Sequence, residues 1–299
     1  MSVVMEELLS LLDLENLEVN LFRGRSHDYF GHNVFGGQVL GQALMAAGRT
    51  VENNLLAHSL HAYFLRPGNP KSPIVYSVER VRDGRSFTTR TVKAIQFGEI
   101  IFTMMASFAT EEAGFDHQFP MPDVEGPEAF TSELDLRRMI APYVPEKHRA
   151  WLELERPIEL RPIDPVNPFD AQPKEPMRGH WMKAQMTLPD DPFLHQCMLA
   201  FSSDFALMGT AMLPHGAHFM QPDMQCASID HAMWFHREAR MDEWLYYHMD
   251  APSASAAKGM NRGLIYTRDG RLVASTAQEG LQRRRAPRPK NAESSPPIA

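Results

Sequence analysis

The feature that most constrains the fold of this chain is an internal repeat. Residues 58–66 read HSLHAYFLR and residues 228–236 read SIDHAMWFH, two strand-like segments that superpose with His61 on His231. A second pair, FGEIIFTMMAS at 97–107 and DGRLVASTAQE at 269–279, matches at nearly the same offset. Because repetition at a fixed spacing indicates repeated structural units, we expect two copies of one architecture. Positions where the copies differ should then show which half carries the chemistry.

Each copy is predicted to hold one helix and a run of strands. In the first copy, residues 34–50 form the helix, and its glycines at 37, 41 and 48 lie near one face, which would let the helix approach a sheet closely. Strand-like segments surround this helix at 18–24, 58–66, 72–82, 86–96 and 100–109. The second copy repeats the order with a helix at 191–212 and strands at 157–163, 179–187, 226–236, 244–251, 255–267 and 271–282. This pattern indicates an α+β fold in which two antiparallel sheets, each wrapped on a central helix, merge into one continuous sheet without the edges that a single unit would expose.

The proline content divides the chain further. Eleven of the 23 prolines fall between Pro120 and Pro176, where so many prolines prevent regular strand pairing. We therefore expect an N-terminal unit at 1–115, a Pro-rich connector at 116–178, a C-terminal unit at 179–284 with 157–163 as a candidate first strand, and a disordered basic tail at 285–299. The connector is expected to pack on the body through its large apolar residues, which include Phe119, Phe130, Trp151 and Leu152.

Composition excludes several classes of protein. No stretch of the sequence approaches the roughly 20 apolar residues of a membrane span, and the N-terminus is acidic where a signal peptide is basic. Only two cysteines occur in 299 residues, which argues against a disulfide scaffold and suits a reducing cytoplasm. The net charge is −7 even though the tail is basic, so nucleic-acid binding is not expected. These features predict a cytoplasmic protein without a membrane or nucleic-acid partner.

The two copies differ at three positions that carry polar chemistry. When GGQ at 36–38 is aligned with SSD at 202–204, Gln38 corresponds to Asp204. In the strands, His58 corresponds to Ser228, and residues 104–106 correspond to 276–278. The second copy thus gathers a carboxylate, a hydroxyl and an amide. This asymmetry predicts one reaction centre per chain, built mainly from the second half.

Such a trio can activate water. Asp204 would take a proton from water as a general base, while Ser228 and Gln278 hold the water against a carbonyl carbon. Backbone N–H groups at Gly36 and Gly37 are candidates to bind the developing oxyanion. The pattern then fits direct hydrolysis of an activated acyl group without an acyl-enzyme. A purely structural interpretation also fits these residues: Asp204 satisfied by Ser202 or Ser203, Ser228 as a strand-end hydroxyl, and Gln278 facing solvent.

Several blocks of the sequence together resemble one family. FRGRS, VFGGQVLGQAL, HSLHAYFLRPG, RDGRSF, SSDFAL, ASIDHAMWFHR, SASAAKG and RGLIYTRDGRLVASTAQEG are similar to the bacterial acyl-CoA thioesterase II family over residues 1–285. The resemblance implies a double-hotdog fold and hydrolysis of fatty acyl-CoA to free acid and coenzyme A. It places the family's Asp, Thr or Ser, and Gln on Asp204, Ser228 and Gln278. It also implies a homodimer or homotetramer and no cofactor, because coenzyme A is part of the substrate.

Other polar residues are candidates for roles around this trio. Histidines invite a nucleophilic triad, but the chain has no GxSxG elbow, and the equivalent repeat positions of His61 and His231 indicate structural roles. His58 stays a reserve residue near the site, and no histidine spacing suits a metal. The phosphates of coenzyme A call for cations at the pocket mouth, for which the candidates are Arg66, Arg85, Lys258 and Arg262. A hotdog hydratase or dehydratase and a non-catalytic acyl-CoA-binding protein remain alternative functions.

Overall fold

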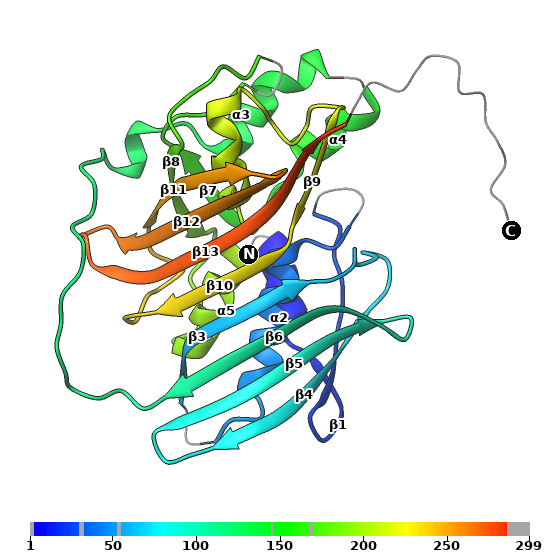
Figure 1. Ribbon diagram of the computed structural model, residues 1–299, viewed down its shortest axis with the longest axis vertical. Coiled ribbons are helices and arrows are strands. Elements are labelled where there is room, and N and C mark those ends of the chain that lie inside the picture. Colours follow the sequence, from blue (N-terminus) through cyan, green and yellow to red (C-terminus); the bar gives the residue numbers. More distant parts are fainter. Residues whose placement is uncertain (1–2, 30–32, 53–54, 145, 168–169, 286–299) are drawn as a thin grey trace, which may run out of the picture.

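The computed structural model describes residues 3–29, 33–52, 55–144, 146–167 and 170–285. In this part of the chain, all thirteen strands form one antiparallel sheet (Figure 1). The first unit contains α1 (Val3–Leu12), β1 (Glu15–Glu18), β2 (Leu21–Gly24), α2 (Gly36–Gly48), β3 (Leu56–Phe64), β4 (Ile74–Asp83), β5 (Phe87–Gln96) and β6 (Glu99–Ala109). The second contains β7 (Ile158–Pro162), β8 (Met177–Ala184), α5 (Pro192–Ser202), η3 (Leu207–His215), β9 (Met224–Ser228), β10 (Asp230–Phe235), β11 (Leu245–Ser255), β12 (Lys258–Thr267) and β13 (Leu272–Arg284).

The strand order of the sheet displays the duplication. It runs β1-β2-β4-β5-β6-β3-β10-β13-β12-β11-β8-β7, so each half is the reverse of the other, and β3 and β10 join the halves at the centre. The helices α2 and α5 lie together behind the middle of this sheet (Figure 1). The predicted fold, two helix-wrapped antiparallel sheets merged into one, is confirmed.

The register between β3 and β10 corrects the predicted alignment of the copies. His61 pairs with Ala232, whereas His231 pairs with Ala62. Neighbouring residues of a strand face opposite sides of the sheet, so His61 and His231 cannot be equivalent. His61 is exposed, and His231 is fully buried.

A shift by one residue restores the symmetry. Each central strand contains one irregular residue, His58 in β3 and Ile229 between β9 and β10, and these two correspond. Leu60 then corresponds to His231, and the two-fold axis passes between His61 and Ala232. By the same count Ala57, and not His58, is the counterpart of Ser228.

The glycine face of α2 contacts the other helix instead of the sheet, so this part of the prediction is wrong. A Cβ atom on Gly37 would lie 2.1 Å from the carbonyl oxygen of Phe201, and one on Gly41 would lie 3.0 Å from that of Cys197. A Cβ atom on Gly48 would enter the ring of Phe193. The missing side chains therefore let α2 and α5 pack backbone against backbone.

The predicted helix at 191–212 is interrupted. α5 ends at Ser202, a turn follows in which Ala206 has a φ of 64°, and η3 begins at Leu207. Asp204 therefore follows the C-terminal end of α5, whereas Gln38 lies in the first turn of α2. The predicted correspondence of these two residues does not hold.

The connector lies against the second half of the sheet. It contains η1 (Pro127–Ala129), α3 (Glu133–Ile140), η2 (Ala141–Tyr143) and α4 (Glu146–Glu153). Phe130 packs beside the buried Trp181, whose indole N–H donates to the carbonyl oxygen of Glu125. Leu152 is buried, but Phe119 is 73% exposed. The side chain of Trp151 and nearly all of the predicted basic tail lie outside what the structure describes.

One stretch of the described chain, residues 192–215, is long and apolar enough to cross a membrane by composition. It is mostly buried inside the protein, where α5 packs on α2 and η3 on the sheet.

Replacing Gly37 with alanine is expected to lower the free energy of unfolding by about 3 kcal/mol, the upper part of the range for overpacked cores. Alanine normally stabilises a helix relative to glycine, but here its methyl group would displace the backbone of α5. Urea unfolding measures the loss. Gly114→Ala is the control, because a Cβ atom there meets nothing within 4 Å. Equal stability of the two variants would contradict the proposed packing constraint.

Candidate active site

The site is built around Asp204, in the turn between α5 and η3. Gln278 of β13 donates from Nε2 to Asp204 Oδ1 at 2.7 Å, and the backbone N–H of Gly37 also donates to this carboxylate. Burial raises the pKa of Asp204, and the two hydrogen bonds from Gln278 and Gly37 oppose this shift. Gly36 belongs to the same contact, because a Cβ atom there would lie 2.7 Å from Asp204 Oδ2. The carboxylate of the second unit thus lies at the N-terminus of α2, where the helix dipole favours a negative charge.

Gln278 is fully buried, and its two ends have different surroundings. Nε2 contacts His231 Nδ1 at 3.1 Å in addition to Asp204. Oε1 is buried without a hydrogen-bond partner among the described residues. A buried amide oxygen without a partner is costly, and such a group commonly accepts a hydrogen bond from water or from a ligand.

His231 connects Gln278 to the turn that carries Asp204. Its Nε2 lies 2.9 Å from the hydroxyl oxygen of Ser203, and that hydroxyl donates to the carbonyl oxygen of Ala200. Because Ser203 uses its only proton on Ala200, His231 donates from Nε2 and accepts at Nδ1 from Gln278. Burial lowers the pKa of His231 to about 3, so the ring is neutral at physiological pH.

The backbone of the same turn is fixed from the sheet. The hydroxyl of Tyr247, on β11, donates to the carbonyl oxygen of Ser203 at 3.0 Å and lies 2.7 Å from the hydroxyl of Thr276. Asn261, on β12, accepts from the N–H of Ala211 and thereby holds η3. Strands of the second unit therefore hold the residues on both sides of the turn.

Ser228 lies near this group without a direct bond to it among the hydrogen bonds of the described residues. It ends β9 and pairs with Gly280, two residues along β13 from Gln278. Paired residues share a face, and so do residues two apart, which places Ser228 on the Gln278 side of the sheet. Its side chain is half-buried. The structure thus joins Asp204 and Gln278 directly and places Ser228 on the neighbouring strand.

The structural interpretation of the trio fails in two respects. Gln278 does not face solvent, and the hydroxyls of Ser202 and Ser203 donate to the backbone carbonyls of Met198 and Ala200. Gly37 uses its N–H on Asp204, so in this state it is not open to a substrate oxygen. His58 bonds to Ser107 at 2.8 Å and packs edge-on against Phe87, a separate group of residues.

The four candidate cations have different surroundings. Arg66 pairs with Glu99 at 3.0 Å, and Arg262 makes two hydrogen bonds to Asp250. Arg85 is exposed in the turn between β4 and β5. Lys258 is half-buried at the start of β12, beside the row in which Gly259, Gly280 and Ser228 pair across three strands. Of the four, Lys258 is therefore the candidate whose backbone the register places nearest Ser228, but its side chain, one residue from Gly259, faces the other side of the sheet.

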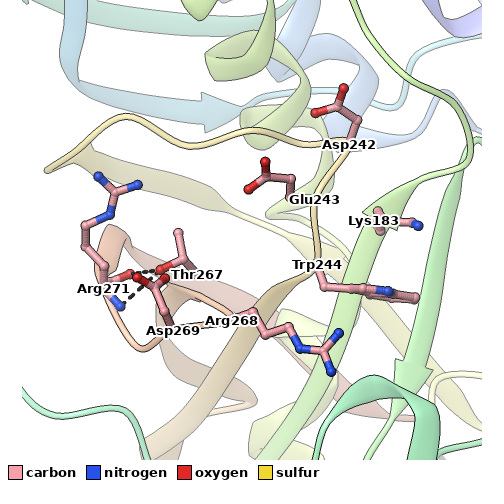
Figure 2. Close-up of a pocket in the computed structure, with 8 residues that line it drawn as sticks. All are labelled: Lys183, Asp242, Glu243, Trp244, Thr267, Arg268, Asp269 and Arg271. Atoms are coloured by element: carbon pink, nitrogen blue, oxygen red, sulfur yellow. Dashed lines mark hydrogen bonds between the residues drawn. The ribbon is translucent and has the colours of Figure 1, made fainter.

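A hollow of the described surface lies away from Asp204. It encloses about 680 Å³ beside the β12–β13 turn (Figure 2). Its lining mixes charges of both signs around Trp244, above which lie Arg161 and Lys183. None of the residues that hold Asp204 lines it. Among the described residues no group of three His, Cys, Asp or Glu side chains is placed to hold a metal ion.

Sequence reasoning missed the role of His231 in this site. The predicted alignment of the two copies matched His231 with His61, and a histidine in both copies indicated a structural role. The corrected alignment makes it equivalent to Leu60, and a histidine at the position of a core leucine in the other copy is the signal that could have identified it.

Comparisons with known proteins identify the family of the chain. A model of the acyl-CoA thioesterase N-terminal domain matches residues 25–109, and a model of the acyl-CoA thioesterase family matches residues 148–281. Acyl-CoA thioesterase 2 of Haemophilus influenzae is 41% identical over 95% of this chain and 99% of its own length. Human acyl-coenzyme A thioesterase 8 is 40% identical over 92% of this chain and 88% of its own.

A solved structure supports the same assignment. An acyl-CoA thioesterase II from Mycobacterium marinum superposes with a TM-score of 0.75 at 39% identity, over 93% of this chain and 98% of that one. The fold and these relatives thus define a thioester hydrolase with two fused hotdog units. The chain belongs to the acyl-CoA thioesterase family.

Replacing His180 with leucine is expected to reduce the pH dependence of stability. Burial, with Arg178 nearby, lowers the pKa of His180 from 6.5 to about 3, so between these values the unfolded chain binds a proton that the folded protein does not. The stability contributed by the neutral ring is complete above pH 6.5 and is lost as the pH falls towards 3, by about 1.4 kcal/mol per pH unit. Urea unfolding of both proteins between pH 5 and 8 measures the difference, and parallel curves would contradict it. Little loss is expected at pH 8, because Nε2 of His180 has no partner among the described residues.

Proposed function

We propose that the protein hydrolyses fatty acyl-CoA thioesters by direct attack of a water molecule held by Asp204, Gln278 and Ser228. The observation that carries this proposal is the buried Gln278 amide, which is bonded to Asp204 through nitrogen and leaves its oxygen without a described partner. A water molecule bound there would donate one hydrogen bond to Gln278 Oε1 and the other to the Asp204 carboxylate. Its lone pair would then be directed towards the carbonyl carbon.

The chemical steps follow from these roles. The water oxygen forms a bond to the thioester carbonyl carbon while Asp204 takes the proton. The tetrahedral intermediate collapses by breaking the carbon–sulfur bond, and the departing thiolate takes up the proton held by Asp204, which gives coenzyme A and the free acid and restores the carboxylate. The reaction requires no cofactor in this scheme. The N–H of Gly36 remains our candidate for oxyanion binding, since Gly37 donates to Asp204.

The substrate class is proposed from the relatives, which are named as acyl-CoA thioesterases. Arg85 and Lys258 remain our candidate cations for the phosphates of coenzyme A, because Arg66 and Arg262 already pair with carboxylates of this chain. Self-association also remains a prediction. Exposed apolar side chains on β3, β6 and β10, namely Tyr63, Met105 and Trp234, offer a surface for it. The cytoplasmic location is likewise still a prediction from sequence.

Asp204→Asn is expected to lower kcat for fatty acyl-CoA by 10²- to 10⁴-fold, because it removes the general base. Ser228→Ala should cost about tenfold, the value of one hydrogen bond to the water, while Ser228→Thr retains the hydroxyl and most of the rate. Release of free thiol, followed with a thiol reagent, measures each rate.

The matched control is Asp242→Asn. The side chain of Asp242 is only 7% exposed and bonds to Arg240 and to the N–H of Leu188, outside the site. Its rate per folded molecule should be close to that of the wild type. An Asp204→Asn variant with unchanged hydrolysis would refute the mechanism.

The fall in activity at acidic pH is expected to follow the protonation of the Asp204 carboxylate. The carboxylate must be ionised to act, and burial raises its pKa, so activity is present above that pKa and falls about tenfold per pH unit below it. Gln278→Ala removes a hydrogen bond that lowers this pKa, so the residual activity of this variant should show this fall at higher pH. A fall that stays in place or moves to lower pH would exclude Asp204 as the titrating group.

A further inference from the structure

We infer that His231 is a positioning residue that fixes the orientation of the Gln278 amide and links it to the turn carrying Asp204. This inference rests on the proposed function, because it assigns His231 a role through Gln278. His231 need not touch the substrate to act in this way. It is fully buried and contacts Gln278 and Ser203.

The duplication shows that the fold itself does not need this histidine. In the first unit the corresponding positions are Leu60 and Ala106, which pair across β3 and β6 and are both fully buried. In the second unit the same two positions hold His231 and Gln278, on β10 and β13. An apolar pair is therefore compatible with the sheet at this point, whereas burying a polar pair costs free energy because the pair loses its contacts with water. The polar pair occurs in the unit that also carries Asp204.

The hydrogen bonds allow only one orientation of the amide. Asp204 Oδ1 and His231 Nδ1 both present lone pairs to Gln278, at 2.7 and 3.1 Å. An amide nitrogen has two protons and can serve both, whereas a flipped amide would place its oxygen against two acceptors. Oε1 must therefore point away from both groups, to the position where it has no described partner.

Ser203 determines which nitrogen of His231 acts as the acceptor. The hydroxyl of Ser203 donates to Ala200, so it can only accept from His231 Nε2. The ring is thereby held in the tautomer with a bare Nδ1. The resulting chain, Gln278 to His231 to Ser203, ends one residue before Asp204. The amide and the carboxylate are thus fixed relative to each other by two routes, one direct and one through His231.

A double-mutant cycle tests the inference with acyl-CoA hydrolysis as the measurement. His231→Leu introduces the residue of the first unit, and we expect kcat to fall 10- to 100-fold with KM changed less than about twofold, because misplacement of a reacting group affects mainly the chemical step. In a Gln278→Ala background the same substitution should change kcat less than about twofold, because there is no amide left to orient. His231→Asn should recover part of the rate, since its amide oxygen can take the place of Nδ1.

Two further variants separate this role from a loss of stability. Ser203→Ala removes only a hydroxyl, and we expect a fall in kcat of about threefold to tenfold that also disappears in the Gln278→Ala background. His195→Leu is the control, because it removes another buried histidine of the second unit, one whose Nδ1 accepts from the N–H of Met241. Its effect on kcat should be small and equal in both backgrounds.

The outcomes distinguish a failure of the inference about His231 from a failure of the proposed function. Equal losses from His231→Leu with and without Gln278 would show that the histidine acts on the fold alone, and would overturn the inference. Should His231→Leu fail to fold, the cycle with Ser203→Ala decides in the same way. Wild-type activity of Asp204→Asn and Gln278→Ala would instead refute the proposed function itself.

Discussion

The site depends on the close crossing of α2 and α5. Gly37 lies so near the carbonyl oxygen of Phe201 that no side chain fits between them. This contact brings the C-terminal end of one helix to the N-terminal end of the other, and the first residues after α5 therefore reach the N–H groups that begin α2. Asp204 is among them, and it receives a hydrogen bond from Gly37. The backbone contact that joins the two units thus also places the carboxylate.

The sheet is nearly symmetric, and the site is not. The two-fold axis relates every strand of one unit to a strand of the other, yet η3 and the break after Ser202 occur in the second helix region alone. That break frees Asp204 from the regular helix and allows Tyr247 and His231 to hold Ser203 beside it. In the first unit, Leu60 and Ala106 keep the corresponding region apolar. One unit therefore supplies the dipole of a helix N-terminus, and the other supplies the side chains that we propose to react.

Sequence patterns predicted the elements well because those patterns act locally. Alternating apolar residues and turn residues placed the strands from β3 to β6 within a few residues of their observed bounds. The errors arose where tertiary contacts decide. Sequence similarity placed His61 on His231, but a one-residue difference reverses the face of a strand, and the register follows from the irregular residues His58 and Ile229. The partner of the glycine face and the break after Ser202 depend equally on contacts between the units. Asp204 and Gln278 were predicted from residue type and family resemblance, whereas the link through His231 could be seen only in three dimensions.

The reactivity proposed for Asp204 depends on opposing effects on its pKa. Burial raises the pKa of the carboxyl and so favours the protonated form, which cannot accept a proton from water. Strong hydrogen bonding alone would lower the pKa and make the carboxylate a weak base. Gln278 and Gly37 supply two donors to a carboxylate that is otherwise largely desolvated, which keeps the ionised form accessible while preserving its basicity. Because one of these donors is a side chain that also presents its oxygen to the site, the same amide sets both the strength of the base and the proposed position of the water.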